Sequence, residues 1–165
     1  MKLQDHVEKI KTLTEKAFSN YFARLGLTAS KQLEINKLPE ELKNKRTRLD
    51  NIINSHIAEK GTYEKAYEKV LEEFTFTLFN RLAAIKVMEA HLLFPEVITK
   101  RAEHGDRSFS HKAWLDENPQ RSKEEFEGIR EFLKDEFNKL GEKIFLYSAQ
   151  YNYALLHYVV DLNEI

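Results

Sequence analysis

The stretch YEKVLEEFTFTLFNRLAAIKVMEAHLL, residues 67–93, decides the fold class of this chain. Its large apolar residues recur every three or four positions, the spacing that gathers side chains on one face of a helix. These residues are Tyr67, Val70, Leu71, Phe74, Leu78, Leu82, Ile85, Met88 and Leu92. From Phe74 onward more apolar residues fill the flanks, and they are Phe76, Phe79, Ala83, Ala84 and Val87. Because a helix that is apolar on most sides is buried among neighbours, we predict a long central helix over about residues 63–93.

The segments before this helix also show helical patterns. Residues 5–25 carry apolar side chains on one face, and Gly26 follows as a C-terminal cap. A second helix begins at Leu38-Pro39-Glu40-Glu41, because proline is tolerated in the first turn and acids face the positive end of the helix dipole. Gly61 ends this helix, and Thr62 caps the central one. Residues between the first two helices fit either a short helix or a loop.

The segments after the central helix are shorter. Residues 99–110 are polar, which predicts a loop, and Ser110–Leu115 predicts a short helix. Ser122 and Glu125 have the spacing of a capping box, in which the serine and the glutamate satisfy backbone N–H groups at a helix start. They predict a helix that begins at Ser122 and is closed by Gly141.

The composition agrees with a helical protein. The 165 residues include only five glycines and three prolines, whereas sheet-rich domains need many tight turns and usually more of both. A chain of this length has the common size of one domain. We therefore predict an all-α fold, an irregular multi-helix bundle around a long, largely buried central helix, with residues 1–165 as a single helical domain.

Several classes of site are excluded by what the sequence lacks. There is no cysteine, so disulfides, thiolate metal sites and a cysteine nucleophile are absent. The glycines are spread singly, without the glycine-rich turn that binds phosphate or a nucleotide cofactor. The first residues are charged and amphipathic rather than a secretion leader, and no apolar run is long enough to span a bilayer. We expect a cytoplasmic protein without a catalytic or cofactor-binding residue of its own.

Two basic clusters are the main candidates for a nucleic-acid contact. The net charge is −1, which weighs against an autonomous DNA-binding domain and leaves only a local patch. One cluster is Lys43, Lys45, Arg46 and Arg48. The other brackets the loop after the central helix, and we select it as the candidate patch, with the residues Lys100, Arg101, Arg107, His111 and Lys112. A solvated surface of mixed charge is the alternative for both clusters.

The histidines raise the alternative of a metal-dependent helical enzyme. Zinc and iron sites usually show two histidines, or a glutamate and a histidine, at helical spacing. Only Glu103, His104, Asp106 and His111 are close enough in sequence to weigh. Their spacing lacks the geometry of a known site, so a polar loop is the favoured interpretation and we predict no metal.

The end of the sequence predicts a docking surface. Residues 151–160 are apolar and predict a final helix, and the amphipathic pattern runs on to the last residue. We expect this where a polypeptide continues beyond residue 165. The candidate docking residues are Tyr151, Tyr153, Leu156 and Tyr158.

The sequence from Phe79 to Ala90, FNRLAAIKVMEA, resembles a segment of large bacterial DNA adenine methyltransferases. In these proteins an aromatic-Asn-Arg-Leu start leads to a basic residue and then Met-Glu. The likeness extends through PEVITKRAEHGDRSF, residues 95–109, Trp114-Leu115, and YNYALL, residues 151–156. The family includes the PglX-like methyltransferases of the BREX phage-defence systems and related type II restriction–modification methylases. The resemblance covers about the second half of the chain.

This resemblance implies a helical N-terminal domain that precedes a methyltransferase fold. It implies methylation of adenine N6 in DNA with S-adenosylmethionine as the cofactor of the full-length protein. The partners it implies are the protein's own C-terminal methyltransferase domain, with contacts to DNA or to other defence proteins left open. The motifs for cofactor and adenine have no counterpart in this sequence, so no catalytic residue is carried over. The alternative is a free-standing helical protein-interaction module of a defence or regulatory system.

Overall fold

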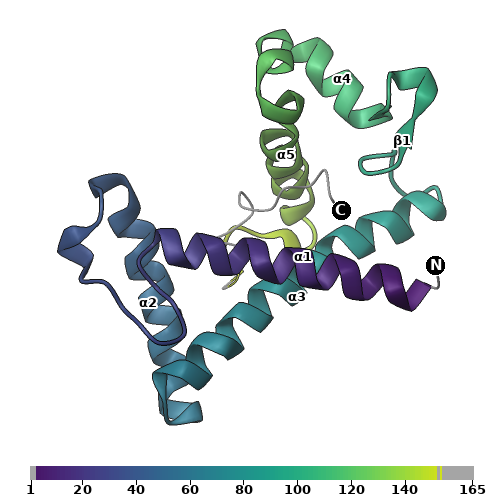
Figure 1. Ribbon diagram of the computed structural model, residues 1–165. Helices are drawn as coiled ribbons and strands as arrows, with labels where there is room; N and C mark the ends of the chain where they lie inside the picture. Colours follow the sequence, from purple (N-terminus) through teal and green to yellow (C-terminus); the bar gives the residue numbers. More distant parts are fainter. Residues whose placement is uncertain (1–2, 152, 154–165) are drawn as a thin grey trace. The chain divides into compact units, whose positions relative to one another are not determined.

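The computed structural model describes residues 3–151 and residue 153, and these residues confirm the predicted all-α fold (Figure 1). They fall into two compact units, which we describe separately. The described residues of unit 1 are 3–77 and 153, and those of unit 2 are 78–151. The boundary lies within the long helix α3, so this one helix contributes to both cores.

The elements follow the predicted order. The α-helices of the described residues are α1 (Leu3–Arg24), α2 (Glu40–Lys60), α3 (Tyr63–Ala90), α4 (Phe109–Glu117) and α5 (Ile129–Gly141). The two short strands are β1 (Lys100–Arg101) and β2 (Arg107–Ser108). Single 3₁₀ turns lie at Ile35–Lys37, Ala102–His104, Pro119–Lys123, Glu125–Gly128 and Phe145–Tyr147.

The core of unit 1 is a cluster of aromatic rings between α1 and the first half of α3. The ring centroids of Phe22 and Phe74 are 5.6 Å apart in an edge-to-face arrangement, and those of Phe22 and Tyr67 also lie 5.6 Å apart. Such pairs stabilise a core beyond the area that they bury. Helix α2 adds the buried side chains of Leu49 and Ile53.

Arg46 interrupts the apolar stripe of α2, yet it is buried. Its Nη1 donates to the carbonyl oxygen of Leu25 at 2.9 Å, and its Nε donates to the carboxylate of Asp50 at 2.8 Å. The Leu25 carbonyl follows directly after α1, where carbonyl groups lack partners inside the helix. Arg46 therefore ties α2 to the end of α1, and Gly26 with its φ of 77° ends α1 as predicted.

Unit 2 is organised around a second buried arginine, Arg81 of α3. Its Nε donates to the carbonyl oxygen of Leu146 at 2.7 Å, and its guanidinium lies 5.4 Å from the ring centroid of Phe137. The Tyr147 hydroxyl donates back to the Arg81 carbonyl at 2.7 Å. Burial lowers the pKa of Arg81 to about 10, so the side chain stays charged at neutral pH. Within unit 2 the guanidinium contacts a carbonyl oxygen and aromatic rings.

Gly141 ends α5 for a different reason from the one the sequence suggests. A Cβ atom at this position would lie 2.8 Å from the carbonyl oxygen of Tyr147, closer than side-chain carbons approach backbone. Its backbone is not left-handed. The glycine is therefore required because the segment around Tyr147 crosses it closely.

Glu89, buried in the last turn of α3, fixes the path of the chain that follows. Its carboxylate accepts backbone hydrogen bonds from Val97 at 2.7 Å, Ile98 at 2.6 Å and Thr99 at 3.3 Å. The Lys86 Nζ lies 3.5 Å from this carboxylate and adds a cation beside it. Burial alone raises the pKa of Glu89, but these hydrogen bonds and the lysine outweigh it and hold the pKa below its usual value.

Three expectations are corrected. The capping box at Ser122 does not form: Ser122 donates to the Pro119 carbonyl, and α5 begins only at Ile129. The flanks of α3 are not all covered, because Phe76 is 45% and Val87 is 57% exposed. The segment predicted as a loop over residues 99–110 instead contains a short β-hairpin.

Helix α3 ends in a Schellman motif with leucine where glycine is usual. The Leu93 N–H donates to Met88 and the Leu92 N–H to Glu89, the paired bonds that define the motif. Leu92 occupies the left-handed position, with φ of 56°. Its side chain is 92% exposed, so packing does not offset the backbone strain.

We expect Leu92→Gly to raise the free energy of unfolding by about 0.5–1 kcal/mol, because glycine adopts the left-handed region without a Cβ clash. Urea unfolding followed by far-UV circular dichroism measures it. Leu93→Gly is the control, because Leu93 has no positive φ, and it should not stabilise the protein. A Leu92→Gly variant less stable than the parent contradicts the prediction.

Candidate functional site

The candidate patch lies in unit 2, on the hairpin and the start of α4. Strand β1 pairs antiparallel with β2, and Lys100 lies opposite Ser108. Ser108 is also the N-cap of α4, where its Oγ accepts from the His111 N–H at 3.1 Å. The hairpin therefore runs directly into the helix. This brings the five predicted residues, Lys100, Arg101, Arg107, His111 and Lys112, into one short region.

Two of these residues are held by carboxylates. The Arg101 Nε lies 3.0 Å from Glu96 Oε1. Arg107 grips Glu127 at two points, with its Nε 2.6 Å from Oε2 and its Nη2 2.5 Å from Oε1. These contacts raise the pKa of both arginines and lower that of both glutamates. Both guanidinium charges are thus balanced within the protein.

His111 belongs to the core of unit 2. It is buried against Phe132, with ring centroids 4.9 Å apart, and near Trp114. Its Nε2 lies 3.0 Å from the Glu127 carbonyl oxygen, and since a carbonyl only accepts, Nε2 carries a proton. Burial lowers the pKa of His111, and the positive charges of Arg107 and Lys100 add to this, so the ring is neutral at neutral pH.

The remaining two residues, Lys100 and Lys112, are exposed and form no ion pair with other residues that the structure describes. Nucleic-acid contact through this region stays a prediction, and these two lysines are the ones free to make it. Phosphate contacts are additive and salt-dependent, so two of them give only weak binding.

The most strained backbone of unit 2 lies beside this region. Phe126, Glu127 and Gly128 are all left-handed, with φ of 53°, 54° and 66°. The left-handed region costs a non-glycine residue roughly 1–2 kcal/mol. Two contacts of Glu127 fix this turn: Arg107 donates to its carboxylate, and His111 donates to its backbone carbonyl. Strain of this kind persists only where surrounding contacts over-determine it.

The metal alternative rests on Glu103, His104, Asp106 and His111. Within the described part of the chain, no three histidine or acidic side chains gather closely enough to hold an ion. The His111 Nε2 is already used by a carbonyl. The His104 ring instead lies edge-on to Phe109, with centroids 5.8 Å apart.

The first basic cluster lies on α2 in unit 1. Arg46 is buried as described, and Lys43 pairs with Glu40 at 2.6 Å. Lys45 is half-buried and only Arg48 is fully exposed. These residues therefore do not form a continuous basic surface.

The predicted docking residues are only partly within the described chain. The Tyr153 ring lies 5.3 Å from Phe74, and its hydroxyl is 3.1 Å from His56 Nε2, both in unit 1. The Tyr151 ring lies 5.6 Å from that of Phe145 in unit 2. Both tyrosines are half-buried. Leu156 and Tyr158 lie outside the described residues.

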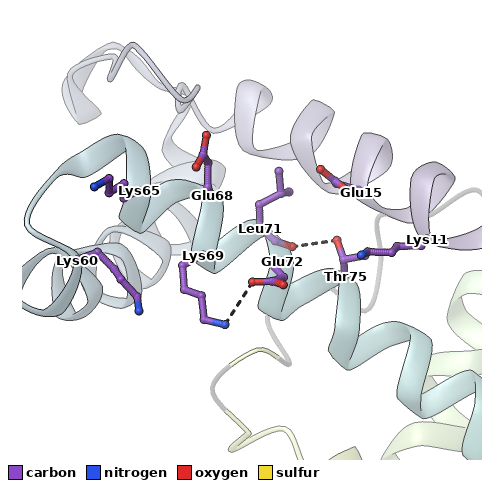
Figure 2. A pocket seen from close by; sticks show the side chains of 9 residues that line it. All are labelled: Lys11, Glu15, Lys60, Lys65, Glu68, Lys69, Leu71, Glu72 and Thr75. Atoms are coloured by element: carbon purple, nitrogen blue, oxygen red, sulfur yellow. Dashed lines mark hydrogen bonds and ion pairs between the residues drawn. The ribbon is translucent and has the colours of Figure 1, made fainter. Parts of the chain in front are cut away.

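Unit 1 carries a surface groove of about 550 Å³ between α1, the end of α2 and α3 (Figure 2). Its lining alternates in charge, and much of it is paired. Lys69 contacts both Glu72 and Glu73, and Lys60 contacts Glu59. The residues of the lining are Lys11, Glu15, Lys60, Lys65, Glu68, Lys69, Leu71, Glu72 and Thr75. This mixture favours neither an anion nor a cation.

Sequence reasoning missed Glu127, which is central to this region. Its partners Arg107 and His111 lie 20 and 16 residues earlier, so no helical or turn spacing connects them. The sequence pattern places Glu127 in a helix, because Ser122 and Glu125 precede it at capping-box spacing. No signal in the single sequence distinguishes a helix at Glu127 from the left-handed turn that the structure shows.

Comparisons with known proteins found no matching family model, no similar curated protein and no similar solved structure. None of the helices that the structure describes combines the length and the apolar character needed to cross a membrane.

We expect Glu127→Gln to lower the free energy of unfolding by about 1 kcal/mol, the upper end for a partly exposed pair. The side chain keeps its shape and loses the charge that grips Arg107. Urea unfolding followed by Trp114 fluorescence measures it, and the difference should shrink in about 1 M salt. Glu124→Gln removes the local pair with Arg121 as a control, and should cost less than about 0.5 kcal/mol. Equal losses in the two variants would contradict a special role for Glu127.

His111 should make stability pH-dependent. Its pKa is lowered in the folded protein, so the unfolded chain takes up a proton first as the pH falls through about 6.5. The free energy of unfolding should therefore drop from about pH 6.5 down to the folded pKa. His111→Gln keeps an N–H donor and should flatten this part of the curve. Urea midpoints between about pH 5 and 8 measure it, and identical curves for the parent protein and the variant would refute the assignment.

Proposed function

We propose that this chain is a non-catalytic helical domain of an S-adenosylmethionine-dependent DNA adenine methyltransferase in phage defence or restriction–modification. In this role it supports the catalytic core and contributes at most a minor contact to DNA. Its partner is the methyltransferase domain of the same protein, and the cofactor binds there.

One observation carries this proposal beyond the sequence resemblance. Three charged residues in the resembling stretches, Arg81, Glu89 and Arg107, hold unit 2 together through Leu146, residues 97–99 and Glu127. These three side chains are engaged by a carbonyl oxygen, backbone N–H groups and a glutamate, so they serve contacts within the protein. Charged residues that stabilise the fold in this way are consistent with a structural, non-catalytic role.

A free-standing protein-interaction module is the second candidate. The exposed apolar residues Val87, Leu92 and Leu93 are compatible with it, because such a surface serves a separate partner protein as well as a domain of the same chain. The two candidates differ in whether the gene product methylates DNA.

The test uses the complete gene product and the 165-residue chain side by side. Expressed in cells that lack adenine methylation, the complete product should place N6-methyladenine at one recurring DNA sequence, read by mass spectrometry and modification-sensitive sequencing. The 165-residue chain should produce none, and calorimetry with S-adenosylmethionine should give no binding heat. A complete gene product that leaves host DNA unmodified would overturn the proposal, and cofactor binding by the short chain would overturn the non-catalytic assignment.

A further inference from the structure

The backbone that leads into α5 is left-handed over three successive residues. Phe126, Glu127 and Gly128 have φ of 53°, 54° and 66° and ψ of 33°, 37° and 25°. Among L-amino acids only glycine adopts this region without a steric penalty, so Phe126 and Glu127 are both strained. The Phe126 side chain is also 39% exposed, so burial of its ring does not explain the conformation. The turn is therefore held against the preference of its own backbone.

The sequence of the same segment favours a right-handed helix. Ser122 and Glu125 have the spacing of a capping box, and the residues between them are lysine and glutamate, which are good helix formers. Phe126 lies seven residues, about two helical turns, before the buried Leu133, so it continues the apolar stripe of α5. Helix α5 begins at Ile129 without a side-chain cap. A helix that began after Ser122 would gain one.

Glu127 makes the contacts that oppose this longer helix. Arg107 donates to both of its carboxylate oxygens, and the His111 Nε2 donates to its backbone carbonyl at 3.0 Å. In a right-handed helix the same carbonyl would point along the axis and accept from the Glu131 N–H. The two acceptor geometries of the Glu127 carbonyl thus belong to different backbone conformations. Arg107 stabilises the left-handed one.

The pair that holds Glu127 is open to solvent. The side chains of Arg107 and Glu127 are each 34% exposed, so water weakens their attraction. The carboxylate of Glu89, in contrast, is buried and accepts three backbone hydrogen bonds. A segment held by a partly exposed pair opens more easily than one held by buried contacts. The strained turn is therefore fixed by a contact that can be released while the rest of unit 2 stays folded.

We propose that residues 122–128 are a two-state segment, and that the ion pair of Arg107 with Glu127 sets its state. With the pair formed, the turn is left-handed and α5 begins at Ile129. When the pair opens, residues 123–128 become right-handed and join α5, with Ser122 as the N-cap. Arg107 then loses its carboxylate partner, so the two states differ in exposed positive charge as well as in helix length. This inference concerns unit 2 alone and is independent of the proposed function.

Backbone NMR of the 165-residue chain tests this, because the chemical shifts of residues 122–128 report their φ and ψ. The parent protein should show left-handed values at Phe126 and Glu127. Glu127→Gln weakens the pair with little change of shape, and it should show right-handed values over residues 123–128. The Glu131 N–H then gains a helical acceptor, so its hydrogen exchange should slow at least about threefold.

Glu124→Gln is the matched control. It removes a carboxylate of the same segment, one that pairs with Arg121 at 2.7 Å, and leaves the pair of Arg107 with Glu127 intact. The turn should stay left-handed in this variant. Arg107→Gln opens the pair from the other side and should give the same long helix as Glu127→Gln. It also keeps the test decisive if Glu127→Gln does not fold.

Removal of the expected cap gives a second readout. Ser122→Ala, added to Glu127→Gln, should lower the ratio of right-handed to left-handed segment about fivefold, because the N-cap hydroxyl is lost. An unchanged ratio would contradict a helix that begins after Ser122. Three further results would overturn the inference: a turn that stays left-handed in Glu127→Gln and Arg107→Gln, shifts typical of an unstructured segment in these variants, and equal responses to Glu127→Gln and Glu124→Gln.

Discussion

The buried carboxylate of Glu89 is the contact on which the second half of the molecule depends. A carboxylate removed from water is costly unless its oxygens are fully hydrogen-bonded. Here three successive backbone N–H groups, from Val97 to Thr99, satisfy it together with Lys86. The chain is therefore anchored one residue before β1 begins. The hairpin, the Ser108 cap of α4 and the ion pair of Arg107 with Glu127 come next along the chain.

Features that depend on near neighbours in sequence were predictable. Gly26 and Gly61 adopt left-handed conformations at the ends of α1 and α2, as expected for glycines after an apolar pattern. Thr62 accepts a hydrogen bond from the Lys65 N–H at the start of α3. Each of these helix ends is determined within one helical turn, where the residue type alone sets the favoured backbone conformation.

Features that depend on distant partners were not predictable. Ser122 and Glu125 have a good capping-box spacing, worth about 1 kcal/mol in general. The stabilisation by a capping box is outweighed by the contacts of Glu127 with Arg107 and His111, which hold the backbone of this turn in the left-handed region. Arg46 and Arg81 break apolar stripes, and their residue type does not tell which groups surround them. Each is buried and donates to a backbone carbonyl near the end of another element. A single sequence does not show which residues distant along the chain lie close together in the fold.

The apolar pattern of α3 shows where sequence periodicity and structure meet. Periodicity predicts that Val87 and its neighbours are covered, and the structure leaves Val87 57% exposed. Periodicity indicates that apolar side chains are favoured in a buried position, and it does not specify which residues bury them. On the buried side of α3, Phe22 of α1 packs against Phe74, and Arg81 donates to the Leu146 carbonyl beside Tyr147. On the other side Val87 stays 57% exposed, so periodicity along the helix does not by itself tell which apolar side chains are covered.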